Sequence, residues 1–288
     1  MIRRRRALAA FAVCCLAAGT ALGVARLADG EFPSARAVEA PAAWRGDKAP
    51  PRRQTTRRPG GMPTEAEQRR AVERLIRLGY PILCGGGRRG RYIALTFDDG
   101  PGPYTTLMLK ILRKRHLRAT FFLTGTSIER FPDLPRRETE LASLGNHSWS
   151  HPYLPGLSPS GILSELRRTQ DLIRRRTGLT PRLFRPPYGA RDADVDRIAR
   201  SLGLLQVLWS IDSGDSTGSD VEGVAENIRA ALGPGSIVLL HENRATTIKS
   251  LLRYVLPEIK RRGLRAVSVP ELLALDPPSP EQLRSRDC

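Results

Sequence analysis

The feature that most constrains the fold of this chain is an alternation of two patterns that begins after Arg91. Short apolar runs alternate with longer stretches in which apolar residues recur at helical spacing. This alternation is typical of βα units built on a parallel sheet. It predicts strands at Tyr92–Phe97, Ala119–Leu123, Leu183–Arg185, Leu205–Ser210, Ser236–Leu240 and Arg265–Ser268. It predicts helices near Tyr104–Lys114, Glu138–Leu144, Ser160–Arg176, Ala193–Leu202, Val221–Leu232 and Thr247–Arg262. The expected fold class is α/β, and the alternation by itself fits both a closed barrel and a doubly wound sheet.

The unusual polar residues of this region fall just past the predicted strand ends. They are Asp98 and Asp99, Arg185, Asp212 and Asp215, and His241. The carboxyl ends of parallel strands meet at one edge of a sheet, which is where α/β proteins bind their ligands. The sequence therefore predicts one polar site at that edge.

Two histidines, His147 and His151, lie four residues apart. This spacing predicts that both project from one face of a helical turn and grip one ion. The pair Asp98-Asp99 offers a carboxylate, and two histidines with one carboxylate form a common open zinc site. Neither motif is specific alone, because such histidines also occur as solvated or capping pairs and Asp98-Asp99-Gly100-Pro101 also suits a turn. In the metal-site interpretation, one carboxylate binds the ion and its neighbour accepts a proton from water whose pKa the ion lowers to about 7.

Four motifs taken together are more specific than any one of them. They are Thr96-Phe97-Asp98-Asp99-Gly100-Pro101, His147-Ser148-Trp149-Ser150-His151, Arg185-Pro186-Pro187-Tyr188-Gly189 and Leu239-Leu240-His241. Their order and approximate spacing resemble those of the polysaccharide deacetylases, the NodB-like carbohydrate esterases of family 4. The resemblance implies a distorted (β/α) barrel, with a catalytic domain at residues 91–276 and a C-terminal tail at 277–288. It also implies removal of acetyl groups from N-acetylated, and sometimes O-acetylated, sugar polymers.

The resemblance implies a role at the metal for the first two motifs. Asp99, His147 and His151 are similar to the family's metal ligands, for zinc or another divalent transition metal such as Co²⁺. Asp98 resembles the catalytic base that takes a proton from the activated water. Arg185 would pair with Asp98 and keep it ionised, since a nearby opposite charge favours the charged carboxylate.

The remaining motif residues would act on the substrate. The Tyr188 backbone amide resembles the family's oxyanion donor, Pro187 stiffens that loop beside the substrate, and Leu239 would line the acetyl pocket. His241 resembles the general acid that protonates the departing amine. Asp215 matches the carboxylate that raises the pKa of this histidine by favouring imidazolium.

One family motif, two aspartates followed by tryptophan, matches only in part. Asp212-Ser213-Gly214-Asp215-Ser216 keeps both aspartates and has serine in place of the aromatic residue. Ser216 removes a surface on which a sugar ring could stack, and Trp209 or Trp149 either replaces that surface or packs in the core. The expected substrates are, in order, peptidoglycan N-acetylglucosamine, chitin oligomers and acetylated xylan. The alternatives are a non-catalytic glycan- or metal-binding protein on the same fold, and a basic envelope protein whose arginine-rich arm binds anionic polymer.

The N-terminus predicts export. Arg3–Arg6 precede an uncharged apolar stretch from Ala7 to Ala25. Such a stretch suits a cleaved signal peptide and is also long enough to span a bilayer, so residues 1–26 are a signal peptide or a membrane anchor. Residues 27–61 are rich in Pro, Ala and Arg and predict a flexible basic linker. Within residues 62–90, Thr64–Leu78 predicts a short packing helix that begins with a capping box.

The charge and cysteine content suggest further expectations. A formal net charge of +18 suits anionic partners, which for an exported protein would be cell-wall polymers. No helix-turn-helix signature, zinc finger or basic run interleaved with aromatic residues is visible, so no nucleic-acid partner is expected. Outside the N-terminal segment the chain has two cysteines, Cys84 and Cys288. Because thiols tend to pair in exported proteins, we expect a disulfide between them, with two free thiols as the alternative.

Overall fold

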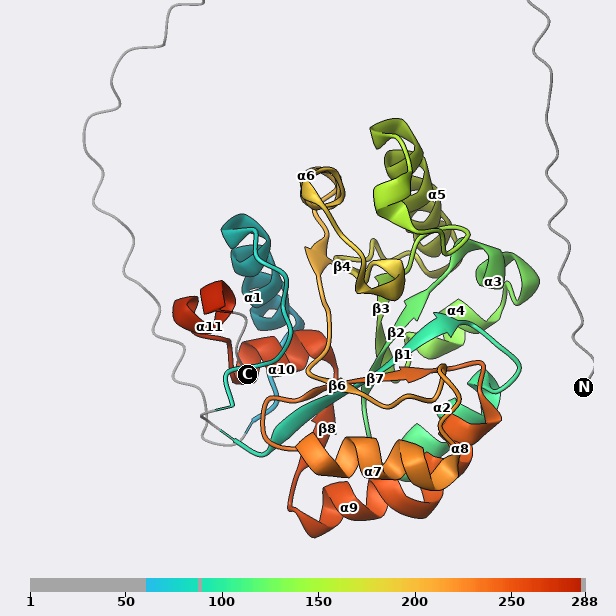
Figure 1. Cartoon of the computed structure of the whole chain (residues 1–288), viewed down its shortest axis with the longest axis vertical. Helices are drawn as coiled ribbons and strands as arrows, with labels where there is room; N and C mark the ends of the chain where they lie inside the picture. Colours follow the sequence, from blue (N-terminus) through green and yellow to red (C-terminus); the bar gives the residue numbers. More distant parts are fainter. Residues whose placement is uncertain (1–60, 88–89, 286–288) are drawn as a thin grey trace, which may run out of the picture. The chain divides into compact units, whose positions relative to one another are not determined.

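A curled parallel sheet lies at the centre of the computed structural model, which describes residues 61–87 and 90–285 (Figure 1). Neighbouring strands follow the order β5-β4-β3-β2-β1-β7-β6, and β8 also pairs with β1. All of these pairs are parallel. The strands are β1 (Tyr92–Gly100), β2 (Ala119–Leu123), β3 (Ala142–Asn146), β4 (Leu183–Phe184), β5 (Leu205–Gln206), β6 (Ile211–Asp212), β7 (Ile237–His241) and β8 (Arg265–Val267).

One extended stretch, Leu205–Asp212, pairs with strands at both ends of the sheet. Its first part pairs with β4, where the Val207 N–H donates to the Phe184 carbonyl over 2.8 Å. Its last part pairs with β7, where the Ser210 N–H donates to the Ile237 carbonyl over 3.1 Å. A regular (β/α) barrel would place a helix between neighbouring strands, so the barrel is distorted here. The fold class is the predicted distorted (β/α) barrel, and the predicted strand Leu205–Ser210 is divided between β5 and the approach to β6.

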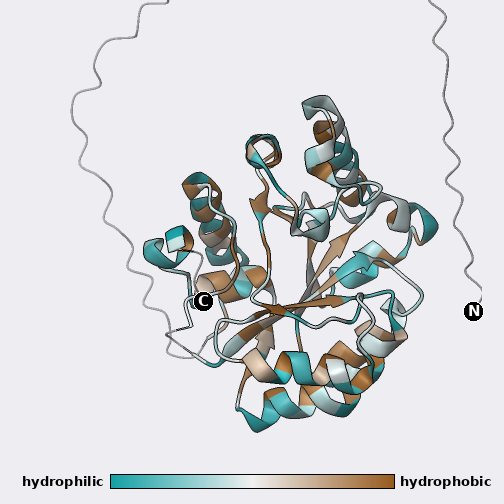
Figure 2. Ribbon diagram, viewed as in Figure 1, coloured by the Kyte–Doolittle hydropathy of each residue, from teal (hydrophilic) through white to brown (hydrophobic). Residues whose placement is uncertain are grey.

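Helices connect most of the other strands and surround the sheet (Figure 1). Figure 2 shows that the strands are mainly hydrophobic, whereas the helices combine hydrophobic and hydrophilic residues. The helices are α1 (Glu65–Leu78), α2 (Thr105–Lys114), α3 (Gly125–Arg130), α4 (Leu134–Glu138), α5 (Pro159–Thr177), α6 (Ala193–Ser201), α7 (Val221–Ala231), α8 (Ala245–Ser250), α9 (Leu256–Arg261), α10 (Val269–Leu275) and α11 (Pro280–Ser285). A π-helical turn, Leu251–Val255, joins α8 to α9, so the predicted helix Thr247–Arg262 is helical but not uniform.

The central strand β1 separates two parts of the core. Alternate residues from Ile93 to Phe97 pack in a cluster that includes residues of α2, α7 and α9. Ala94 belongs to a second cluster with residues of α1 and α10. Because side chains alternate along a strand, Thr96 and Asp98 lie on the same face as Ala94. Asp98 therefore lies inside the barrel, on the face of β1 whose earlier residue Ala94 packs in the second apolar cluster.

The predicted helix Glu138–Leu144 is wrong. Helix α4 ends at Glu138, a turn follows at residues 139–141, and Ala142–Asn146 form strand β3, which pairs with β2. Strand β3 has no β-branched residue, so its local propensity does not favour a strand, and the pairing with β2 overrides that propensity. Gly145 is part of the reason, because a Cβ there would lie 2.4 Å from the Phe122 ring. The glycine lets that ring pack across the strand pair.

Helix α1 is the predicted packing helix, and its capping box is present. The Thr64 hydroxyl accepts from the Glu67 N–H, and the Glu67 carboxylate accepts from the Thr64 N–H. The helix packs against α10 and β5. It is therefore attached to the barrel rather than separate from it.

Several predictions for the two ends of the chain fall wholly or partly outside the described residues. The signal peptide or anchor at residues 1–26 and nearly all of the linker at 27–61 belong to this group. Within residues 61–87 and 90–285, no helix has the length and apolar character to cross a membrane. Cys84 is disulfide-bonded, but Cys288 lies outside the described residues, so its pairing with Cys84 stays a prediction. The predicted tail contains α11, whose Leu283 packs into the second core cluster.

We expect Leu75→Ala to lower the free energy of unfolding by about 2–5 kcal/mol, since it removes a buried leucine from the contact between α1 and the barrel. Leu78→Ala on the same helix is the matched control, because Leu78 is 44% exposed. Denaturant unfolding of both variants measures the difference. Equal effects of the two substitutions would show that α1 adds nothing to the stability of the barrel.

Candidate active site

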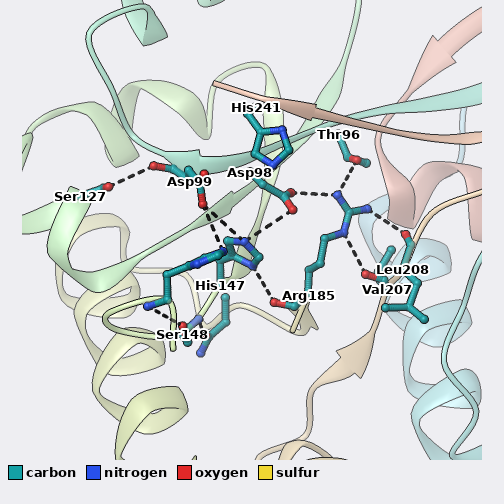
Figure 3. A network of polar contacts seen from close by, with 12 residues as sticks. Thr96, Asp98, Asp99, Ser127, His147, Ser148, Arg185, Val207, Leu208 and His241 are labelled. Carbon is teal, nitrogen blue, oxygen red and sulfur yellow. Dashed lines mark hydrogen bonds and ion pairs between the residues drawn. The ribbon is translucent and has the colours of Figure 1, made fainter. Parts of the chain in front are cut away.

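The predicted polar residues meet at the carboxyl edge of the sheet (Figure 3). Asp98 and Asp99 lie near the end of β1, His147 follows β3, Arg185 follows β4, and His241 ends β7. Asp98 lies directly opposite His241 in the register of β1 and β7. Residues separated by up to 143 positions along the chain thus become neighbours, as the strand-end pattern predicted.

Asp98 and Arg185 form a buried ion pair. The Arg185 Nη1 donates to the Asp98 Oδ1 over 2.8 Å and to the Thr96 hydroxyl over 2.7 Å. Its Nε and Nη2 donate to the carbonyls of Val207 and Leu208 over 3.0 and 2.9 Å. Burial raises the pKa of Asp98 above its ordinary value, and the charge of Arg185 opposes that increase. The carboxyl is thus a stronger proton acceptor than an exposed aspartate while a fixed cation favours its ionised form.

Asp99, His147 and His151 form a set that could hold a metal ion, because their ligand atoms all lie within 4.8 Å of one another. The Asp99 Oδ1 lies 3.6 Å from the His147 Nε2 and 3.5 Å from the His151 Nε2. Asp99 has a φ of 66°, a left-handed conformation that separates its carboxyl from that of Asp98 on the strand. The two adjacent carboxylates therefore have different surroundings.

The two histidines do not lie on a helical turn, so that part of the prediction is wrong. They lie in the loop after β3, where Ser148 and His151 have φ values of 65° and 59°. The Asn146 side chain accepts from the Ser148 N–H over 2.8 Å, and the Ser148 hydroxyl accepts from the His151 N–H over 3.1 Å. These bonds fold the loop so that the imidazole centres lie 4.9 Å apart.

The state of His147 suits metal binding. Its Nδ1 lies 2.7 Å from the Arg185 carbonyl, which accepts a proton there and leaves the Nε2 lone pair toward Asp99. Burial lowers the pKa of His147 to about 3, so the ring is neutral at neutral pH. A neutral imidazole with an oriented Nε2, beside a second histidine and a carboxylate, fits the ligand preference of zinc.

His241 and Asp215 form a second charged pair. The His241 Nδ1 lies 2.7 Å from the Asp215 Oδ1, and the His241 N–H donates to the Asp215 Oδ2 over 2.8 Å. The Thr247 hydroxyl also donates to the Asp215 Oδ2. Burial lowers the pKa of His241, but the hydrogen bond and charge of Asp215 outweigh it and raise that pKa above its ordinary value. The raised pKa favours the protonated form of the His241 ring, which can donate a proton.

These groups face a cavity of about 450 Å³. Its lining residues are Asp98, Asp99, His147, His151, Pro186, Tyr188, Trp209, Asp212, Ser216, Thr217, Leu239, His241 and Arg244. Of the residues predicted to border the substrate, Leu239 and Tyr188 line the cavity, whereas Pro187 is buried and outside the lining set. Trp209 lines the cavity, and Trp149 packs against the core with Arg168 over its ring. Trp209 is thus the tryptophan positioned beside a substrate.

Tyr188 has an unusual backbone. Its φ is 60° and its ψ is 10°, and the residue is 69% exposed. The ring lies edge-on to His151, with centroids 4.7 Å apart. The left-handed conformation at a non-glycine residue is costly and is held here between Pro186 and Gly189, where the Gly189 N–H donates to the Pro186 carbonyl over 3.0 Å.

Comparison with known proteins identifies the family that shares this arrangement. The family profile of polysaccharide deacetylase matches residues 85–207. A peptidoglycan-N-acetylglucosamine deacetylase from Bacillus cereus is 31% identical over 198 residues, which cover 67% of this chain and 72% of that protein. The chain belongs to the polysaccharide deacetylase family.

Two further similarities show that the relatives of this chain differ in length and in activity. The peptidoglycan-N-acetylglucosamine deacetylase PgdA of Listeria monocytogenes is 36% identical over 64% of this chain, but the match spans only 39% of that longer protein. A carbohydrate esterase family 4 pseudoenzyme from Bacillus anthracis has a similar structure, with a TM-score of 0.63, 28% identity and coverage of 67% of this chain and 68% of that one. The proteins similar to this chain therefore include both named deacetylases and a pseudoenzyme.

Sequence reasoning missed two buried glutamates of this chain, Glu138 and Glu242. Both are 0% exposed, and the Thr105 hydroxyl donates to the Glu242 Oε1. Burial raises the pKa of Glu242 to about 7, and burial and the Glu242 carboxyl raise that of Glu138 well above its ordinary value. Two such neighbouring carboxyls cannot both ionise readily. The one sequence feature that could have pointed to Glu242 is its position directly after His241, but it belongs to no motif.

We expect Glu242→Gln to stabilise the protein above neutral pH. A carboxyl whose pKa rises from 4.5 unfolded to about 7 folded lowers stability progressively as the pH rises through that interval. The variant lacks this loss, so its free energy of unfolding should match that of the native chain near pH 4.5 and exceed it at pH 8 by up to about 3 kcal/mol. Denaturant unfolding at both pH values measures this. The exposed Glu129→Gln is the control, and a pH-independent effect of Glu242→Gln would contradict the assignment.

Proposed function

We propose that this chain is a zinc-dependent hydrolase that removes acetyl groups from an N-acetylated extracellular glycan. Peptidoglycan N-acetylglucosamine is the favoured substrate, followed by chitin oligomers and acetylated xylan. The observation that carries the proposal is the convergence of Asp99, His147 and His151 with two charged pairs on one cavity. The names of the Bacillus and Listeria relatives support the preference for peptidoglycan.

The alternative is a non-catalytic glycan- or metal-binding protein on the same fold, and the pseudoenzyme neighbour makes it a real competitor. Metal binding alone requires only the three ligands. This chain also keeps Asp98 paired with Arg185, and His241 paired with Asp215, with short hydrogen bonds in both pairs. A binding module has no need for an oriented base and an oriented acid beside the ligand set, so we favour catalysis.

The three ligands would hold the ion, with Asp99 and His151 partly exposed toward the cavity and His147 buried behind them. A bound zinc ion lowers the pKa of water to about 7 and polarises a carbonyl group. Asp98 is the base in this proposal, because its carboxyl lies 3.6 Å from the His147 Nε2 and so beside the ligand set. Arg185 occupies the other oxygen of that carboxyl, which leaves the Oδ2 to accept a proton.

His241 is the acid in this proposal and would donate a proton to the departing amine. The register of β1 and β7 puts it beside Asp98, so base and acid face the same bound group. Asp215 holds the Nδ1 and leaves the Nε2 of the ring to act as donor. The Tyr188 N–H would stabilise the negative charge that develops on the acetyl oxygen. Leu239 would contact the acetyl methyl group, and Pro187 would fix the loop that carries Tyr188.

We expect acetate release from peptidoglycan or N-acetylglucosamine oligomers to require both metal and Asp98. Asp98→Asn should lower kcat by at least about 100-fold, because the amide cannot accept a proton, while metal content stays unchanged. Acetate assays with added zinc and with chelator test this, with exposed Asp133→Asn as the control. Metal binding without any acetate release from the native chain would instead support the binding-protein alternative.

We expect Asp215→Asn to move the alkaline limb of the kcat profile to lower pH. Asp215 raises the pKa of His241, so the protonated acid persists to higher pH in the native chain than in the variant. At pH 8, kcat should fall by roughly ten- to a hundredfold. Asp212→Asn is the control, since that carboxylate accepts from the Gly214 N–H and does not contact His241. An alkaline limb that stays in place in Asp215→Asn would show that His241 is not the titrating acid.

A further inference from the structure

A cationic side chain without a protein partner lines the catalytic cavity. Arg244 is exposed and belongs to the lining set. Among the described residues, its guanidinium takes part in no hydrogen bond, ion pair or ring contact. Arg185 differs completely, because it is fully buried behind the cavity lining and each of its guanidinium nitrogens donates to the protein. The two arginines thus have different tasks, and only Arg244 offers its donors to a ligand.

The backbone around Arg244 is tied to the catalytic groups. The Glu242 N–H donates to the Asp98 carbonyl over 3.0 Å, two residues before Arg244. Three residues after it, the Thr247 hydroxyl donates to the same Asp215 carboxylate that holds His241. Bonds on both sides therefore position the short connection between β7 and α8. A residue on a connection held in this way meets a bound ligand at a defined place relative to His241.

The composition of the rest of the cavity explains what such a cation could recognise. At position 216, where the family pattern has tryptophan, this chain has a serine that lines the cavity. The Ser216 hydroxyl has no protein partner among the described residues. Trp209 and Tyr188 still provide apolar surface for a sugar ring. The cavity therefore combines a stacking surface with unpaired hydrogen-bond donors that include a full positive charge.

We propose that Arg244 selects N-acetylated glycans in which a neighbouring sugar carries a free carboxylate. The proposal rests on the deacetylase function proposed above and narrows its substrate class. A planar guanidinium binds a carboxylate through paired, charge-assisted hydrogen bonds, which a sugar hydroxyl cannot match. A neutral polymer of N-acetylglucosamine leaves Arg244 without a counter-charge. A strand in which alternate sugars carry a lactyl carboxylate, as peptidoglycan does where no peptide is attached, supplies one.

None of the carboxylates that line the cavity neutralises the charge of Arg244. Asp98 is paired with Arg185, and Asp99 belongs to the ligand set. Asp212 lines the cavity, but its carboxylate accepts from the Gly214 N–H and forms no ion pair with Arg244. The positive charge of Arg244 is thus left for an anion that enters with the substrate.

The test compares three tetramers of equal length in the full chain. One is the neutral N-acetylglucosamine tetramer, one alternates N-acetylglucosamine with N-acetylmuramic acid bearing free carboxylates, and one carries the same lactyl groups as amides. Acetate release gives kcat and KM for each. In the native chain we expect the carboxylate tetramer to have the highest kcat/KM. In Arg244→Gln, the ratio of kcat/KM for the carboxylate tetramer to that for its amide should fall by roughly ten- to a hundredfold, mainly through KM.

Two controls make the result specific. Arg244→Lys should keep part of the ratio, because it retains charge without the planar pair of donors. Lys249→Gln removes an exposed cation from α8 outside the cavity lining and should leave the ratio unchanged. If Arg244→Gln lowers kcat/KM equally for the carboxylate and amide tetramers, or for neither, the proposal is wrong.

Binding separates this proposal from the deacetylase function. If the native chain releases no acetate from any tetramer, the function proposed above fails, but calorimetric titration still tests Arg244. Tighter binding of the carboxylate tetramer than of its amide, lost in Arg244→Gln, would then uphold the selectivity. Equal affinities in the native chain would overturn it.

Discussion

The buried ion pair between Asp98 and Arg185 is the interaction on which the rest of the site depends. Burying two charges is expensive, and the cost is offset only when every donor and acceptor is satisfied. Arg185 meets this condition by bonding β1 through Asp98 and Thr96, and the stretch after β5 through the carbonyls of Val207 and Leu208. Its own carbonyl orients His147. One residue thus links the proposed base, a proposed metal ligand and the distorted closure of the barrel.

The surroundings of this pair give two adjacent carboxylates different chemistry. Asp98 lies in the barrel and has a raised pKa, whereas the left-handed backbone of Asp99 sends its carboxyl to the histidines. On the other side of β1, Glu242 occupies space that only a glycine at position 100 leaves free, since a Cβ there would lie 1.7 Å from the Glu242 Oε2. His241 at the end of β7 is followed by Glu242 and Arg244, so the proposed acid, a buried carboxyl and a free cation are positioned together.

Much of the fold and of the candidate site could be predicted, because strand ends and motif spacing depend on residues that are close together in the sequence. Hydrophobic periodicity predicts the strands that begin at Ala119 and Ile237. It also predicts α5 and α6, the helices before and after Leu183. The grouping of Asp98, Arg185 and His241 follows from the parallel sheet, whose strands all end at one edge. The loop conformation of His147 and His151 could not be predicted from their spacing, because a four-residue interval fits a helical turn and this folded loop alike.

The sequence by itself determined the α/β alternation, the identity of the polar residues at the strand ends and the capping box of α1, since each depends on neighbours within a few positions. Only the tertiary structure decided that residues 142–146 form a strand, that one extended stretch serves both ends of the sheet, and that Trp209 and Arg244 face the cavity while Trp149 does not. These outcomes depend on contacts between distant segments, where packing and hydrogen-bond pairing outweigh local propensity.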